Sequence, residues 1–237
     1  MTASIAQSRV NWPAFDVASV KPNNTGLNSG SISRSGGRIT LDNVSLRECV
    51  MFAYSIPLGR EYELVGPGWL EAEKFDIAAT FPPATSRGLV RDMVRNLLAE
   101  RFGLKVHRES RNLKAYALVK ARGGPKLTQS VSGDNDDDSF TFREGHVTVR
   151  AMSMASFADR LSGSAFHLDR PVVDRTGIVG AYDFTLEWAP NGLSVDERPG
   201  ASLFTAIQEQ LGLKIDAQRI AASILVVDQI NKVPSSN

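Results

Sequence analysis

The chain has 237 residues, of which 42% are hydrophobic and 22% are charged, with a net charge of +1 and one cysteine. These values exclude a largely disordered or collagen-like chain, and the single cysteine excludes a disulfide framework or a multi-cysteine metal site. No apolar run reaches the roughly 18–20 residues of a membrane-spanning helix, and the balanced charge points to no particular class of partner.

The N-terminal residues 1–14 fit no regular element. They lack a basic segment followed by an apolar segment, so no secretory signal is expected in this sequence. Two interpretations stay open: a cytosolic protein, or an exported protein whose signal has been removed. The first predicted strand is Phe15–Val20, and residues 22–37, rich in Asn, Gly and Ser, are predicted to form a loop.

An internal repeat is the main organising feature of the sequence. Residues 38–41 alternate between polar and apolar types, which predicts a strand, and Ser45 then resembles the N-cap of a helix. Residues 146–149 alternate in the same way and are followed by Ser153 and a second amphipathic segment. The two halves of the chain therefore begin with the same predicted order of elements.

Two later landmarks keep nearly the same spacing. Phe75–Ile77 corresponds to Tyr182–Phe184, and both triplets lie in predicted strands. Gly103 and Gly212 each follow a predicted helix, where a left-handed C-cap favours glycine. These strands are predicted at residues 74–80 and 181–188.

The helices before these glycines have one apolar face each. We expect Phe102 and Leu211 to be buried where the helices meet the sheet. The first face comprises Val90, Met93, Val94, Leu97, Leu98 and Phe102, and the second comprises Leu203, Phe204, Ile207 and Leu211.

Two short strands are predicted after each helix: residues 104–108 and 115–120 around a turn near Ser110–Leu113, and residues 213–217 and 224–228. The fold class is therefore α+β, with two tandem copies of a β-α-β-β-α-β-β unit and helices packed on mainly antiparallel sheets. The predicted division is a first repeat at residues 14–122, an acidic and Gly-rich linker at 123–139, and a second repeat at 140–230. A further loop is predicted at residues 190–200.

Six short sequence blocks follow one another along the chain: Phe15–Asn23, Ile39–Leu46, Gly66–Trp69, Phe75–Ile77, Arg101–Lys105 and Asp174–Gly177. Together they resemble a family of exported proteins from Acidobacteria that is catalogued as a domain of unknown function. The resemblance covers residues 14–230. It implies a periplasmic or extracellular location and supplies no catalytic residues. More distantly, each repeat resembles the small modules at the N-termini of secretins and TonB-dependent receptors, which bind protein partners.

Two sets of residues are candidates for hydrolytic catalysis. One sequence cluster has the side-chain types of a hydrolytic triad: His167, Asp169 and Asp174 lie near Ser162 and Ser164. Ser164, His167 and Asp169 are its candidate residues, although no nucleophile-elbow motif accompanies them. His107 and Glu109 fall on one face of a strand, where a carboxylate can orient a general base. The alternative for both sets is ordinary surface polarity.

Other residues are candidates for ligand binding. Trp69 follows a tight turn and either anchors a partner or covers the edge of a core. Arg108, Arg111 and Lys114 belong to a basic stretch, residues 101–126, which either contacts an anionic partner or is solvated. No motif for sequence-specific nucleic-acid recognition accompanies it.

Neither Cys49 nor the aspartates of the linker suggest a reactive or metal site. Cys49 lies within a predicted helix among apolar residues, which favours core packing. Asp134, Asp136 and Asp138 resemble the start of a calcium loop, but Ser139 and Gly145 stand where such a loop needs Gly and Glu.

We therefore expect no metal and no cofactor. The sequence favours an extracytoplasmic binding or interaction module for a protein partner or an anionic envelope component, and the alternative is an esterase-like hydrolase with a site between the repeats.

Overall fold

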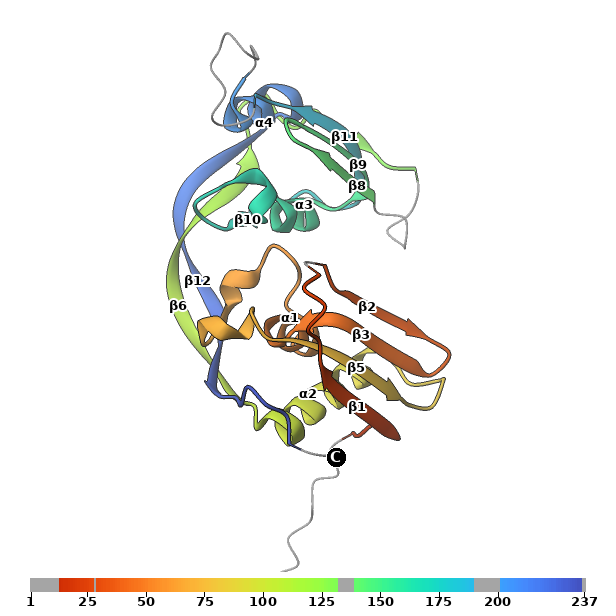
Figure 1. Ribbon diagram of the computed structural model, residues 1–237. Coiled ribbons are helices and arrows are strands. Elements are labelled where there is room, and N and C mark those ends of the chain that lie inside the picture. Colours follow the sequence, from red (N-terminus) through yellow and green to blue (C-terminus); the bar gives the residue numbers. More distant parts are fainter. Residues whose placement is uncertain (1–12, 28, 132–138, 190–200, 236–237) are drawn as a thin grey trace, which may run out of the picture. The chain divides into compact units, whose positions relative to one another are not determined.

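The computed structural model describes residues 13–27, 29–131, 139–189 and 201–235 (Figure 1). Within these residues the fold is mixed α and β, with four α-helices and three four-stranded sheets whose pairs are mostly antiparallel. None of the described helices is both long and apolar enough to cross a membrane. The chain divides into two compact units. The first comprises Met1–Pro57, Glu63–Glu109 and Ile224–Asn237, and the second comprises Leu58–Tyr62 and Ser110–Ser223.

The first unit contains a sheet of four antiparallel strands and two helices. The strand order is β1 (Val17–Pro22), β5 (Lys74–Thr80), β3 (Arg38–Ser45) and β2 (Ser31–Ser35). The core joins alternate residues of β3 and β5, such as Leu41 and Ile77, to the apolar faces of α1 (Leu46–Ala53) and α2 (Arg87–Phe102). The predicted helix face is confirmed, because Phe102 is fully buried.

The helix ends follow from capping residues. Ser45 Oγ accepts a hydrogen bond from the backbone N–H of Glu48, and the Glu48 carboxylate accepts one from Ser45 N, which forms a capping box at the start of α1. Burial would raise the pKa of Glu48, but hydrogen bonds from Ser45 and the nearby Lys74 ammonium lower it overall. Helix α2 begins after Ser86 and ends at Gly103, which adopts φ = 62°.

The second unit contains the sheet β7 (Thr128–Gln129), β11 (Tyr182–Glu187), β9 (His146–Met152) and β8 (Ser139–Arg143), in that order and antiparallel. Helices α3 (Met154–Leu161) and α4 (Leu203–Leu211) pack their apolar side chains against strand residues, such as Val149 and Leu186, in its core. Leu211 is buried as predicted, but Phe204 is 40% exposed. The assignment of Phe204 to the apolar face was wrong. Because Phe204 directly follows Leu203, the two side chains diverge around the helix, and Leu203 is the one that is buried.

The third sheet has the order β10 (Val172–Asp174), β6 (Lys105–Lys120), β12 (Leu213–Gln229) and β4 (Leu64–Val65). Its outer pairs, β10 with β6 and β12 with β4, are parallel. Strands β6 and β12 are neighbours, and each contributes residues to both units.

These two long strands correct the predicted arrangement, in which each was a pair of short strands. The turn expected near Ser110–Leu113 is absent, since β6 continues through it. That segment contains polar residues but no Gly or Pro to reverse the chain, and its residues are mostly exposed positions of one strand. Likewise, β12 runs without interruption through residues 218–223.

The predicted loop at residues 22–37 is also partly wrong, because it contains β2. Gly36 and Gly37, with φ of 56° and 79°, form a two-residue turn that joins β2 to β3. The absence of apolar alternation in β2 hid the strand, since all five of its residues are exposed. Residues 132–138 of the predicted linker and the predicted loop at 190–200 lie outside the described residues.

Candidate functional site

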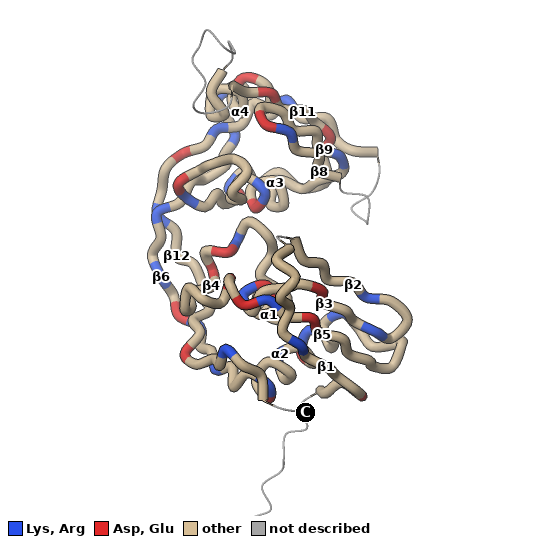
Figure 2. The backbone as a smooth tube through the Cα atoms, in the orientation of Figure 1, with Lys and Arg blue, Asp and Glu red and all other residues tan. Residues whose placement is uncertain are grey.

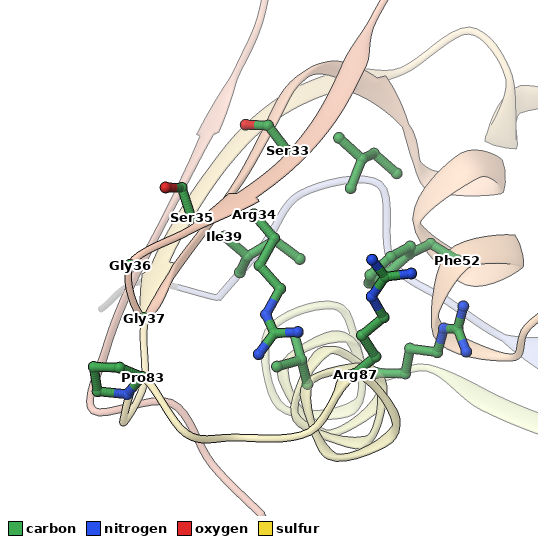
Figure 3. Close-up of a pocket in the computed structure, with 12 residues that line it drawn as sticks. Ser33, Arg34, Ser35, Gly36, Gly37, Ile39, Phe52, Pro83 and Arg87 are labelled. Atoms are coloured by element: carbon green, nitrogen blue, oxygen red, sulfur yellow. The ribbon is translucent and has the colours of Figure 1, made fainter. Parts of the chain in front are cut away.

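The first unit contains a pocket of about 420 Å³ beside the β2–β3 hairpin (Figure 3). Its walls come from β2, the Gly36–Gly37 turn, α1 and the first turns of α2. Ile39, Phe52 and Val90 give the pocket an apolar part. This volume lies in the range of small-molecule sites, which is about 300–1,000 Å³.

Three arginines line the same pocket. Arg34 comes from β2, whereas Arg87 and Arg91 lie one turn apart on α2 and therefore on one face of that helix. Figure 3 shows Arg34 extending from its strand toward the helix that carries Arg87. The residues that line this pocket include no Asp or Glu, so the positive charge is not neutralised there.

The three guanidinium groups differ in how firmly they are held. Arg34 donates a hydrogen bond to the carbonyl oxygen of Thr85, and its Cζ lies 5.2 Å from the centre of the Phe81 ring. Arg91 lies over the ring of Phe52 at 5.9 Å. Among the residues that the structure describes, Arg87 has no hydrogen-bond or ion-pair partner. A guanidinium carries five N–H donors, so this set retains donors for a ligand.

The start of α2 adds to this positive field. Arg87 is its first residue, and its first turn contains no acidic side chain that would offset the positive end of the helix dipole. An anion in the pocket would therefore meet both the guanidinium groups and this helix terminus.

The side chains that line the pocket are of types that bind anions. Ser33 and Ser35 line it, but Figure 3 shows their hydroxyl groups on the side away from the arginines. The lining residues include no His, Cys, Asp or Glu that would serve as a nucleophile or general base. Carboxylates and phosphates are the groups that arginine recognises through paired hydrogen bonds.

A second pocket, of about 770 Å³, lies on the sheet of the second unit. It is lined by Arg150 and Asp183 together with five Ser and Thr residues, so its charges balance. Asp183 is already engaged, because its carboxylate accepts a hydrogen bond from Ala151 N at 2.7 Å. This pocket has no charge preference and is a weaker candidate.

Among the predicted triad residues, the described hydrogen bonds join only Ser164 and His167, and they do so through the backbone. Ser164 opens a short 3-10 helix, Ser164–Phe166, and the backbone N–H of His167 donates to the carbonyl oxygen of Ser164 at 3.2 Å. Asp169 instead accepts hydrogen bonds from Tyr116 and Arg170, which lower its pKa. Within the described residues, no side-chain hydrogen bond joins Ser164, His167 and Asp169.

His107 lies in a carboxylate cluster that the sequence predicted only in part. Its Nδ1 lies 2.8 Å from Asp228 Oδ1, and its Nε2 lies 3.8 Å from Glu109 Oε2. The hydrogen bond to Asp228 is the main cause of the raised pKa of His107. No sequence pattern pointed to Asp228, which comes from β12. All three side chains are at least 40% exposed, so the cluster lacks the enclosure of an active site.

The predicted binding residues are placed on different parts of the fold. Trp69 is half-buried at the edge of the first core, and Lys232 Nζ lies 5.3 Å from the centre of its ring. Arg108, Arg111 and Lys114 are exposed on β6, the first in one unit and the other two in the second. Figure 2 shows lysines and arginines spread over both units with acidic residues between them.

The structure tests the interpretation of Cys49 but not that of the predicted calcium motif. Cys49 is completely buried in α1, and burial raises the pKa of its thiol to about 12, which confirms core packing. Asp134, Asp136 and Asp138 lie outside the described residues. Elsewhere, the described chain has no group of three His, Cys, Asp or Glu side chains suited to a metal ion.

A family model described as "Protein of unknown function (DUF3738)" matches residues 47–230. The chain belongs to this family. The comparison agrees with the resemblance to a family of unknown function that the sequence blocks indicated. No curated protein and no solved structure matches the chain. The DUF3738 match includes Arg87 and Arg91 of the pocket, whereas Arg34 precedes the matched range.

The sequence patterns did not predict the arginine pocket of this DUF3738 chain. Arg34 lies in a segment that was predicted as a loop, and Arg91 is not among the residues of the predicted apolar helix face. The available signals were the Gly36–Gly37 pair, which favours a two-residue hairpin, and the spacing of Arg87 and Arg91. Neither signal shows that the hairpin and the helix meet.

Proposed function

We propose that this protein is a binding module whose first unit binds an anionic ligand, a carboxylate or phosphate attached to an apolar group. The observation that carries the proposal is the convergence of Arg34, Arg87 and Arg91 on one pocket whose lining residues include no carboxylate. The apolar residues Ile39 and Val90 support the second part of the proposal, since they would contact the uncharged part of the ligand.

Charge and solvation explain why such a ligand would be retained. Three guanidinium groups near one another repel, and an anion between them reduces that repulsion while it accepts hydrogen bonds. A hydrogen bond to a charged group contributes about 1.5–3 kcal/mol, which is about tenfold or more in affinity. Because the pocket is open to solvent, we expect binding to weaken as salt is added.

Calorimetric titration with benzoate and phenyl phosphate tests the proposal, with benzyl alcohol as the uncharged comparison. We expect the two anions to bind and the alcohol not to bind measurably. Arg87→Gln should weaken anion binding about tenfold, because it removes the guanidinium that has no protein partner. Arg122→Gln is the matched control, since Arg122 is exposed outside the pocket. Equal affinities for the anions and the alcohol, or equal effects of the two substitutions, would contradict the proposal.

The location outside the cytoplasm is also a proposal, and it is supported by the resemblance of the sequence blocks to exported acidobacterial proteins. A protein partner or an anionic envelope component is consistent with the charge of the pocket. We still expect the basic residues Arg108, Arg111 and Lys114 to form a second contact surface for such a partner. Fractionation of cells that produce the native protein, with cytoplasmic and periplasmic markers as controls, tests the location.

We further propose that the two units are copies of one ancestral repeat. Asn43 in β3 and Ala151 in β9 both have left-handed backbone conformations, with φ of 52° and 50°. Asp76 and Asp183 accept a hydrogen bond from these same two backbone N–H groups, at 2.8 and 2.7 Å. An experimental structure in which these two carboxylate–bulge pairs do not superpose would contradict the repeat.

A further inference from the structure

Strand β2 is an edge of the first sheet. Its only strand neighbour among the described residues is β3, and Figure 1 shows it at the outer side of that sheet. Open edges can pair with another chain, and many proteins block them with proline, lysine or a bulge. In β2, Ser31–Ser35, no proline or lysine is present, and the register with β3 is continuous.

The hairpin turn determines which backbone groups of β2 face the open side. In a hairpin with a two-residue turn of this kind, the flanking residues, here Ser35 and Arg38, exchange hydrogen bonds. Hydrogen-bonded and non-hydrogen-bonded pairs then alternate along the ladder. The backbone N–H and C=O groups of Ile32 and Arg34 therefore point away from β3, toward the open edge.

The same two residues connect this edge to the arginine pocket. Ile32 and Arg34 are paired with Leu41 and Ile39, which are buried in the core of the first unit. Cross-strand partners share a face of the sheet, so Ile32 and Arg34 lie on the face where the helices pack. Both residues also line the pocket. Ile32 is 40% exposed, which leaves its apolar side chain available to a partner.

We propose that an extended segment of a partner polypeptide adds to β2 as a further strand and places Asp or Glu side chains, at alternate positions, toward the three-arginine pocket. This inference rests on the proposed function and names its ligand as a peptide. Charge complementarity supports that occupant, because Arg34, Arg87 and Arg91 need acidic groups on the helix-facing side. Backbone hydrogen bonds to Ile32 and Arg34 would give affinity, and the alternating acids would give selectivity.

The experiment compares two acetylated, amidated hexapeptides that contain three Thr and three Glu residues. One alternates Thr with Glu, and the other has the three Glu residues together. Both have the same charge, so a purely electrostatic site binds them equally. We expect the alternating peptide to bind at least tenfold more tightly than the block peptide by calorimetric titration.

Substitution of Ile32 separates the backbone from the side chain. Ile32→Pro removes one outward N–H and keeps the pairing with β3, since proline is tolerated where an edge N–H faces solvent. Ile32→Ala keeps the N–H and removes most of the side chain. We expect the proline variant to lose the preference for the alternating peptide, whereas the alanine variant keeps most of the preference.

A second measurement uses the unaltered protein and an alternating peptide with N-methylated backbone amides, which cannot form a strand ladder. Loss of the tenfold preference supports the inference, and unchanged binding overturns it, whatever the stability of the proline variant. If benzoate binds but the two hexapeptides bind equally, the strand inference is overturned and the proposed function stands. If neither benzoate nor phenyl phosphate binds, the proposed function fails as well.

Discussion

Replacement of Phe102 by alanine tests the assignment of the first core. The side chain is fully buried at the end of α2, and its ring meets that of Phe75 edge-on, with 5.0 Å between centroids. Truncation of a buried phenylalanine to alanine costs about 3–5 kcal/mol, which includes the cavity that remains. We expect about 4 kcal/mol, because an aromatic pair is lost together with the buried area. A loss of this size is a large share of the roughly 5–15 kcal/mol that stabilises a typical domain.

Urea denaturation followed by far-ultraviolet circular dichroism measures the change, as a shift of the transition midpoint. Phe204→Ala is the matched control, since Phe204 is 40% exposed and the same truncation should cost about 1 kcal/mol there. Phe102→Leu, which keeps most of the buried volume, should cost less than about 1.5 kcal/mol. A loss below about 1 kcal/mol for Phe102→Ala would refute the buried orientation of this helix face.

Three other outcomes are expected. Ala151→Gly should stabilise the protein by about 0.5–1 kcal/mol in the same urea assay, because Ala151 has φ = 50°, where glycine is less strained; a decrease in stability would contradict this. Cys49 should react with a thiol reagent only after unfolding, since burial raises its pKa to about 12, and rapid labelling of the native protein would show that α1 opens. NMR titration of His107 should give a raised pKa that falls in Asp228→Asn. This bond stabilises the fold below the pKa of unfolded histidine, and that contribution disappears as pH rises through the raised folded-state value; an unchanged titration in the variant would exclude the bond.

The elements with strong periodicity were predictable from the sequence. Strand β5 has the predicted bounds, and α2 buries the predicted apolar face and ends before Gly103. Ser45 and Ser153 cap α1 and α3 as expected. Periodicity reports which face of an element is buried, so it succeeds where one side meets a core and the other meets solvent.

Elements without that contrast were not predictable. Strand β2 is exposed along its whole length, and the middle of β6 is polar, so neither has an alternating apolar signal. The arginine pocket also depends on pairing between segments far apart in sequence. Arg34 and Arg87 meet only because β2 joins a sheet that α2 covers, and no local pattern contains that information.

The first unit cannot be completed until nearly the whole chain has been synthesised. Leu225 and Val227 of β12 belong to its core, and β4 pairs with β12 through Leu225 and Val226. A ribosome that has released only residues 14–122 has therefore not yet made part of that core. The complete core of the first unit therefore forms only after the C-terminal strand has been synthesised, unlike the usual order in which N-terminal domains are completed first during translation. The same connection means that a gene fragment cut between the halves would encode a first unit without its last strand.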